Sequence, residues 1–119
     1  MKIFSTIIIF GLLANLSTQE KIELPAPQPR EQIVHHENYS LSYIEGYELA
    51  SWVAYELTKE EAKSEIEYKV KYREDPDIPT GSATTKDYKN AGYIMGQLAF
   101  IEHMMMSEIS ARESFYLSN

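Results

Sequence analysis

The stretch of sequence that decides the fold is DYKNAGYIMGQLAF, which runs from Asp87 to Phe100 in a chain of 119 residues. Its two glycines, Gly92 and Gly96, are isolated, so the stretch is not a Gly-rich loop that could cradle a phosphate. Within it and beyond it, apolar residues keep the spacing of one helix face, at Ile94, Leu98, Ile101, Met105 and Ile109. Residues 100–113 are predicted to form a helix.

Upstream of this stretch, the sequence mostly favours strands. Residues 39–43 alternate between apolar and polar side chains, and residues 52–57 form a second β-prone run. The most regular alternation lies at residues 65–73, where charged residues alternate with Ile66, Tyr68, Val70 and Tyr72. We therefore expect a strand there with a charged, solvated face, and a further extended segment over residues 114–118.

Two short signals separate these runs. Thr58 and Glu61 form a capping box, in which each side chain binds the other residue's backbone N–H, and they predict a short helix from Lys59 to about Ser64. Residues 75–82 contain proline and glycine, which favour a loop.

The chain divides into three parts. Residues 1–18 have the layout of a secretory signal peptide, because Lys2 precedes an apolar run that is too short to span a bilayer. Residues 19–32 hold three alternating prolines and predict an extended linker, and residues 33–119 form the folded domain. We therefore expect a secreted or periplasmic protein with no membrane contact after cleavage of the signal peptide.

The composition narrows the possible functions. The chain has 18 acidic against 11 basic residues, which argues against a simple electrostatic nucleic-acid binder, and no cysteine, which excludes disulfides and thiolate nucleophiles. Lys69, Lys71 and Arg73 could contact phosphates, or could lie on the solvated face of the expected strand. His35 and His36 are adjacent, as is typical of a solvent-facing loop, so we predict no metal site.

Several blocks of sequence together resemble one family. The 87–100 stretch, the block WVAYELT at 52–58 and the block ESFYLSN at 113–119 resemble the DNA/RNA non-specific endonucleases, secreted nucleases of the ββα-metal (His-Me finger) class. Shorter blocks agree, namely YSLSY at 39–43, REDP at 73–76 and PTGSA at 79–83. The resemblance implies an α+β fold with a small, mostly antiparallel sheet and short helices. Because it covers roughly the N-terminal half of such nucleases, we expect an uncovered sheet edge or face.

The same resemblance implies a degenerate active site. In the family, the Gly-Tyr pair is followed by Asp-Arg-Gly-His, in which the histidine activates water and the arginine helps to hold the phosphate. This chain keeps Gly96 but has Ile94, Met95 and Gln97 at the other three positions. Glutamine cannot accept a proton near neutral pH, and a positioned base contributes about 10²–10⁴ in rate. Methionine cannot stabilise the charge that develops on the phosphate.

The resemblance also bears on cofactors and on the local structure. The family uses Mg²⁺, held mainly by an asparagine that would lie past Asn119, so we expect no cofactor in this chain. Two structures remain possible around the motif. Either the family's strand-then-helix arrangement is kept, which we prefer, or the helix extends back towards Ile94 through Gly96, at a cost of about 1 kcal/mol relative to alanine.

Three hypotheses of function follow. The first is an exported, catalytically inactive fragment or pseudoenzyme of this nuclease family, with nucleic-acid binding by resemblance only. The second is an interaction or inhibitor module that binds a protein partner or a second copy through the apolar Ile94–Met106 surface. The third is an active Mg²⁺-dependent nuclease whose site has moved to Glu102 and His103.

Overall fold

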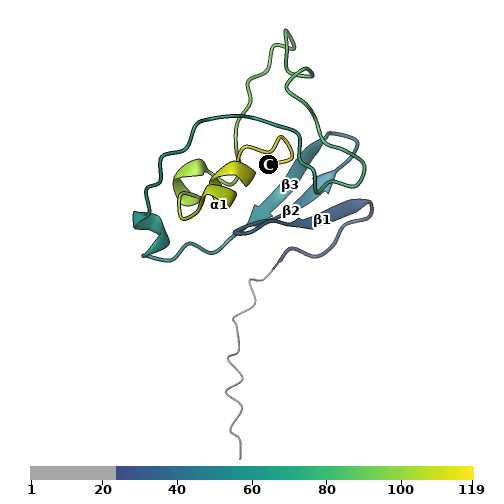
Figure 1. The fold of residues 1–119 in the computed structure, drawn as a ribbon. Coiled ribbons are helices and arrows are strands. Elements are labelled where there is room, and N and C mark those ends of the chain that lie inside the picture. Colours follow the sequence, from purple (N-terminus) through teal and green to yellow (C-terminus); the bar gives the residue numbers. More distant parts are fainter. Residues whose placement is uncertain (1–23) are drawn as a thin grey trace, which may run out of the picture.

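The computed structural model describes residues 24–119, so the predicted signal peptide and the first part of the predicted linker lie outside the described residues. The described chain forms a three-stranded antiparallel sheet in the order β1-β2-β3 (Figure 1). Its elements are β1 (Glu31–His35), β2 (Ser40–Ile44), β3 (Leu49–Ala54), the 3₁₀ turns η1 (Glu61–Lys63) and η2 (Ile101–His103), and the helix α1 (Glu108–Glu113). The predicted α+β fold with a small antiparallel sheet and short helices is confirmed.

The sheet is centred on β2, which pairs with β1 through Leu41 and Val34 and with β3 through Leu41 and Val53. Its pairing with β3 is irregular between Ser42 and Tyr43, where a bulge shifts the register. The 39–43 alternation therefore predicted the central strand correctly. Strand β1 begins at Glu31, two residues before the expected start of the folded domain.

The core forms where the sheet meets segments that are distant in sequence. Its buried side chains are Val34, Tyr39, Leu41, Tyr43, Ile78, Ala99 and Met104. The last residues complete the packing, because the carbonyl of Ser118 accepts the N–H of Ala50 in β3 and Leu117 donates its N–H to the carbonyl of Arg73. Residues 115–119 are buried and lie between β3 and Arg73.

The predicted strand over residues 65–73 does not form. Only Arg73 joins a strand-like pairing, a single parallel bridge to Tyr116, and Val70 is 63% exposed. The alternation is present in the sequence, but a strand also needs a partner for its backbone hydrogen bonds, and along most of this segment the described residues offer none. Figure 1 shows the teal segment after β3 as a long loop that passes around α1.

The predicted helix over residues 100–113 is broken into two pieces. Phe100 has an extended backbone (φ −66°, ψ 141°), so η2 begins no earlier than Ile101. Ser107 is also extended and accepts the N–H of Ser110 on its side chain, which starts α1 as a separate helix. Neither of the two expected arrangements around the motif occurs, since residues 94–100 form neither strand nor helix, and residues 114–118 form turns apart from one bridge residue.

The capping box is confirmed. Thr58 donates its N–H to the Glu61 carboxylate (2.8 Å) and Glu61 donates its N–H to the Thr58 hydroxyl (3.2 Å), at the start of η1. Within residues 24–119, no helix combines the length and the apolar character that crossing a bilayer requires.

Candidate functional site

The motif positions lie on a loop that projects from the sheet, drawn in green in Figure 1. Upstream of the motif, both Asn90 (φ 60°) and Gly92 (φ 79°) have a left-handed backbone. A regular helix or strand therefore cannot run through them into residue 94. The side chain of Ile94 is 94% exposed and that of Met95 is half-buried. The loop therefore presents the first motif positions to solvent.

Gln97 differs from its neighbours because its amide is bound at both ends. Its Nε2 donates to the carbonyl oxygen of Ser114 (2.8 Å) and to the hydroxyl of Ser114 (3.2 Å). Its Oε1 accepts the backbone N–H of Ile101 (3.4 Å). The side chain thus links the motif to the residue that ends α1.

The side-chain amide of Asn119 also binds the backbone of this region. The Oδ1 atom of Asn119 accepts the N–H of Ala99 (2.7 Å), and its Nδ2 donates to the carbonyls of Ala99 (3.1 Å) and Ser114 (2.7 Å). Asn119, Ala99 and Ser114 are all buried. Asn119 therefore uses both ends of its amide on the backbone, which fits its place at the end of the ESFYLSN block and not a role as a metal ligand.

The predicted phosphate-binding cations share one irregular segment and not a strand face. Lys69 and Lys71 are exposed, whereas Arg73 is half-buried and donates from its guanidinium to the hydroxyl of Tyr68 (3.4 Å). These residues and Val70 line one shallow hollow. The two lysines remain accessible to an anion, while the arginine is partly engaged with the protein.

Glu102 and His103 do not act on each other. Glu102 is exposed, and Nδ1 of His103 lies 2.8 Å from the hydroxyl of Tyr55. The Phe100 ring contacts the imidazole edge-on. His103 has an orienting partner of its own, but the neighbouring carboxylate is not that partner.

The predicted apolar surface from Ile94 to Met106 is divided. Met104 is fully buried in the core, and Met105 and Met106 are half-buried, because the chain turns at η2 instead of continuing as one helix. The exposed apolar residues of this surface, Ile94 and Leu98, precede η2 in the chain and line a groove of about 790 Å³ along the projecting loop. Its apolar wall includes Tyr47, Leu49, Tyr93, Ile94 and Leu98.

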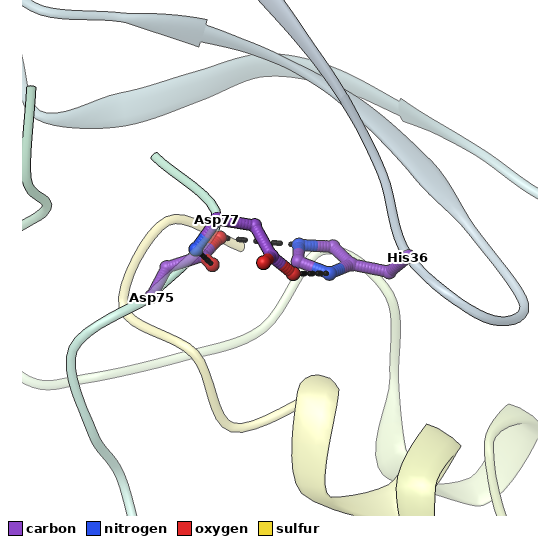
Figure 2. Close-up of side chains that lie close together, drawn as sticks. All are labelled: His36, Asp75 and Asp77. Carbon is purple, nitrogen blue, oxygen red and sulfur yellow. Dashed lines mark hydrogen bonds and ion pairs between the residues drawn. The ribbon is translucent and has the colours of Figure 1, made fainter. Parts of the chain in front are cut away.

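One cluster joins residues that the sequence did not bring together. Figure 2 shows the imidazole of His36 pointing toward the carboxylates of Asp75 and Asp77. Its Nε2 lies 3.1 Å from Oδ2 of Asp75, and its Nδ1 lies 3.4 Å from Oδ2 of Asp77. His36 was expected in a solvent-facing loop, but its side chain is fully buried. The separation of about 40 residues leaves no spacing signal, so only the fold reveals the cluster.

Comparison with known proteins gives the family. A model of the DNA/RNA non-specific endonuclease family matches residues 17–119. The chain belongs to that family. It is similar to Nuclease C1 of Cunninghamella echinulata var. echinulata (26% identical over 108 residues, 87% of this chain and 42% of the relative). It is also similar to the mitochondrial nuclease EXOG of Danio rerio (32% over 95 residues, 78% of this chain and 28% of the relative).

The fold of the endonuclease family is also found among solved structures. A crystal structure of the EndoG/EndoGI complex, which concerns the mechanism of EndoG inhibition, matches with a TM-score of 0.65 and 28% identity. The match covers 73% of this chain and 37% of the other, which confirms a partial ββα-metal fold. This endonuclease-family chain spans less than half the length of the relatives that it matches.

The side chains at the motif positions do not suit the Mg²⁺ that the endonuclease resemblance implies. Magnesium prefers oxygen ligands and near-octahedral geometry. Ile94 and Met95 carry no side-chain oxygen, and the only side-chain oxygen of Gln97 already accepts the N–H of Ile101. At positions 94–97, therefore, the donor set does not fit the ion.

Proposed function

We propose that this chain is an exported member of the endonuclease family that does not itself hydrolyse phosphodiester bonds. One observation carries the proposal. At the position where the family resemblance places the base, Gln97 uses its amide to join the motif to Ser114 and Ile101. An amide has no basic lone pair near neutral pH, so it can orient a group but cannot take a proton from water.

The neighbouring positions support the same conclusion. Hydrolysis needs charge stabilisation around the phosphate as well as a base. Ile94 is exposed and uncharged, and Met95 has no cationic group, so neither can stabilise developing negative charge. Groups that act as a unit lose activity non-additively, so changes at three of them leave little more than background.

A plasmid-nicking assay tests the proposal. The protein, with Mg²⁺ or Mn²⁺ in excess, should leave supercoiled DNA intact over a time in which an active nuclease relaxes it. EDTA-sensitive cleavage by the protein would refute the proposal, and loss of that cleavage in His103→Ala would place the activity at the relocated site.

A reversion experiment tests the motif itself. Ile94→Asp, Met95→Arg and Gln97→His together restore the family's sequence around Gly96. We expect the triple variant to remain inactive, because the three restored side chains together supply one carboxylate, whereas Mg²⁺ prefers a set of oxygen ligands. Cleavage by this variant would mean that another residue holds the metal, and that the three changes alone account for the inactivity of the unaltered chain.

Export is supported by the sequence of residues 1–18, with Lys2 before the apolar run. Mass spectrometry of the protein recovered outside the producing cytoplasm should give an N-terminus within or just after residues 14–18. Retention of Met1 on the recovered protein would contradict the signal peptide.

A second function is favoured by the apolar groove. Ile94 is nearly fully exposed, and Tyr93 and Leu98 line the groove beside it, so association would remove apolar surface from water. The similar solved structure is a complex of EndoG with EndoGI that concerns EndoG inhibition, which supports a protein partner. Light scattering should then give a dimer that Ile94→Lys converts to a monomer, whereas a monomer for both proteins would remove self-association.

A further inference from the structure

The buried imidazole of His36 faces negative charge on two sides. Its Nε2 lies 3.1 Å from Oδ2 of Asp75, and its Nδ1 lies 3.4 Å from Oδ2 of Asp77. The ring is packed against Tyr39 and Tyr116, with centroid distances of 4.7 and 5.4 Å. These contacts exclude water from the faces of the ring and hold its orientation.

Asp75 fixes which nitrogen carries the proton. Its carboxylate accepts the backbone N–H of Asp77 (2.9 Å) and the hydroxyl of Ser118, as well as facing Nε2 of His36. Nε2 of His36 lies at the same carboxylate oxygen of Asp75 that accepts the hydroxyl of Ser118, so Nε2 is the ring nitrogen that is placed to donate to Asp75.

The other nitrogen is then left in an unfavourable position. Nδ1 is buried and has no hydrogen-bond partner in the described part of the chain. With the proton on Nε2, its lone pair faces a carboxylate oxygen of Asp77. Two electron-rich atoms facing each other at this distance repel unless a positive charge lies between them. That charge is either a second proton on the ring or a metal ion.

We propose that Nδ1 of His36 and the carboxylate of Asp77 bind a divalent transition-metal ion of the zinc type. Imidazole nitrogen and carboxylate oxygen are both zinc ligands, at about 2.0–2.2 Å. Two such bonds to atoms 3.4 Å apart enclose an angle near that of a tetrahedron. The Asp77 side chain is 54% exposed, so water can fill the remaining positions.

Asp75 completes the arrangement without binding the metal. A histidine that ligates a metal commonly donates its other N–H to a carboxylate, which orients the ring and raises its basicity. Asp75 holds that place for His36. The ion would bridge the turn between β1 and β2 and the loop at residues 75–77, through residues other than those of the motif at 94–97.

Zinc titration by calorimetry, with the full-length protein, tests the site. We expect one Zn²⁺ per chain, and a loss of affinity of at least about 10-fold in Asp77→Ala. This variant keeps the backbone N–H that binds Asp75, so the local fold has no reason to change. Glu67→Ala removes the same charge from an exposed position outside the cluster and should bind zinc like the unaltered protein.

Imidazole ¹⁵N NMR identifies the ligand atom. Zinc should shift the Nδ1 resonance of His36 while Nε2 remains protonated. The proposal is overturned by the absence of zinc binding, by equal affinity in Asp77→Ala, or by a His36 ring that keeps protons on both nitrogens when zinc is added. None of these readouts depends on nuclease activity, so each stands whether or not the chain cleaves DNA.

Discussion

Replacing Asn119 by alanine should destabilise the protein strongly. The side chain makes three hydrogen bonds, to the N–H of Ala99 (2.7 Å) and to the carbonyls of Ala99 (3.1 Å) and Ser114 (2.7 Å). Ala99 is fully buried, so after truncation its N–H and carbonyl cannot turn to water. Each bond contributes about 0.5–1.5 kcal/mol net, and an orphaned buried group costs about 1–3 kcal/mol.

The expected loss in the free energy of unfolding for Asn119→Ala is therefore about 3 kcal/mol. In a domain of this size, 1 kcal/mol moves the melting temperature by about 4–8 °C, so the shift exceeds about 10 °C. Urea unfolding followed by the fluorescence of Trp52, the single tryptophan, measures the change. Asn119→Asp should lose at least as much, because it keeps the acceptor for Ala99 but turns a second acceptor towards two carbonyls.

Asn90→Gly is the control for this measurement. It removes an exposed amide at a left-handed backbone (φ 60°) that glycine adopts without strain, so its stability should stay within about 0.5 kcal/mol of the unaltered protein. An Asn119→Ala protein as stable as that control would refute the structural role of Asn119. So would a loss of divalent-ion binding at unchanged stability, since Asn119 would then be a ligand.

Three further predictions concern Gln97 and the pH dependence of stability. Gln97→His should lower the free energy of unfolding by about 1–2 kcal/mol, because a neutral imidazole has one donor for the two contacts that Gln97 makes with Ser114. The control is Gln28→His, a change at an exposed position that should alter stability little. Burial raises the pKa of Tyr43 to about 12, and burial together with the Asp75 carboxylate also raises the pKa of Tyr39. The two neutral hydroxyls therefore contribute stability below pH 10, and this contribution should decrease as the pH rises towards 12. The pKa of Asp75 lies below its ordinary value of 3.8. The Asp75 carboxylate therefore contributes to the free energy of unfolding above pH 3.8, and this contribution should be lost as the pH falls below 3.8.

Variants separate these effects from general denaturation. Tyr43→Phe should reduce the loss of stability between pH 10 and pH 12, and an unchanged loss would contradict the assignment to Tyr43. The acid-induced loss should shrink in Asp75→Asn, which removes the titrating carboxylate. A Gln97→His protein that is as stable as the unaltered one would show that the contacts to Ser114 carry no net free energy.

The sequence predicted the parts of the fold that depend on local pattern. Residues 39–43 alternate and become the central strand β2, and Thr58 with Glu61 forms the predicted cap, because both signals act between residues that are close in the chain. The 65–73 alternation failed for the opposite reason. Whether such a segment pairs depends on which backbone lies beside it, and within residues 24–119 only Arg73 has a strand-like partner.

The prediction of one helix face failed because the spacing of apolar residues does not fix the backbone conformation. Ile94 and Met104 fall on one predicted apolar surface, yet one is almost fully exposed and the other is fully buried, since the chain is extended at Phe100 between them. The cluster of His36 with Asp75 and Asp77 was beyond prediction for a related reason. Its members come from two loops that only the closure of the core brings together.

The two amides at Gln97 and Asn119 explain why a changed motif can be kept. A carbonyl oxygen has two lone pairs, and that of Ser114 is occupied by both side chains, at 2.8 and 2.7 Å. Restoring a histidine at position 97 for proton transfer would give up contacts that now stabilise the junction of the motif with α1. Active sites commonly keep residues that reduce stability, and selection for stability alone removes them. Under the proposed function, Gln97 is such a replacement: one substitution both removes the base and adds the hydrogen bonds to Ser114.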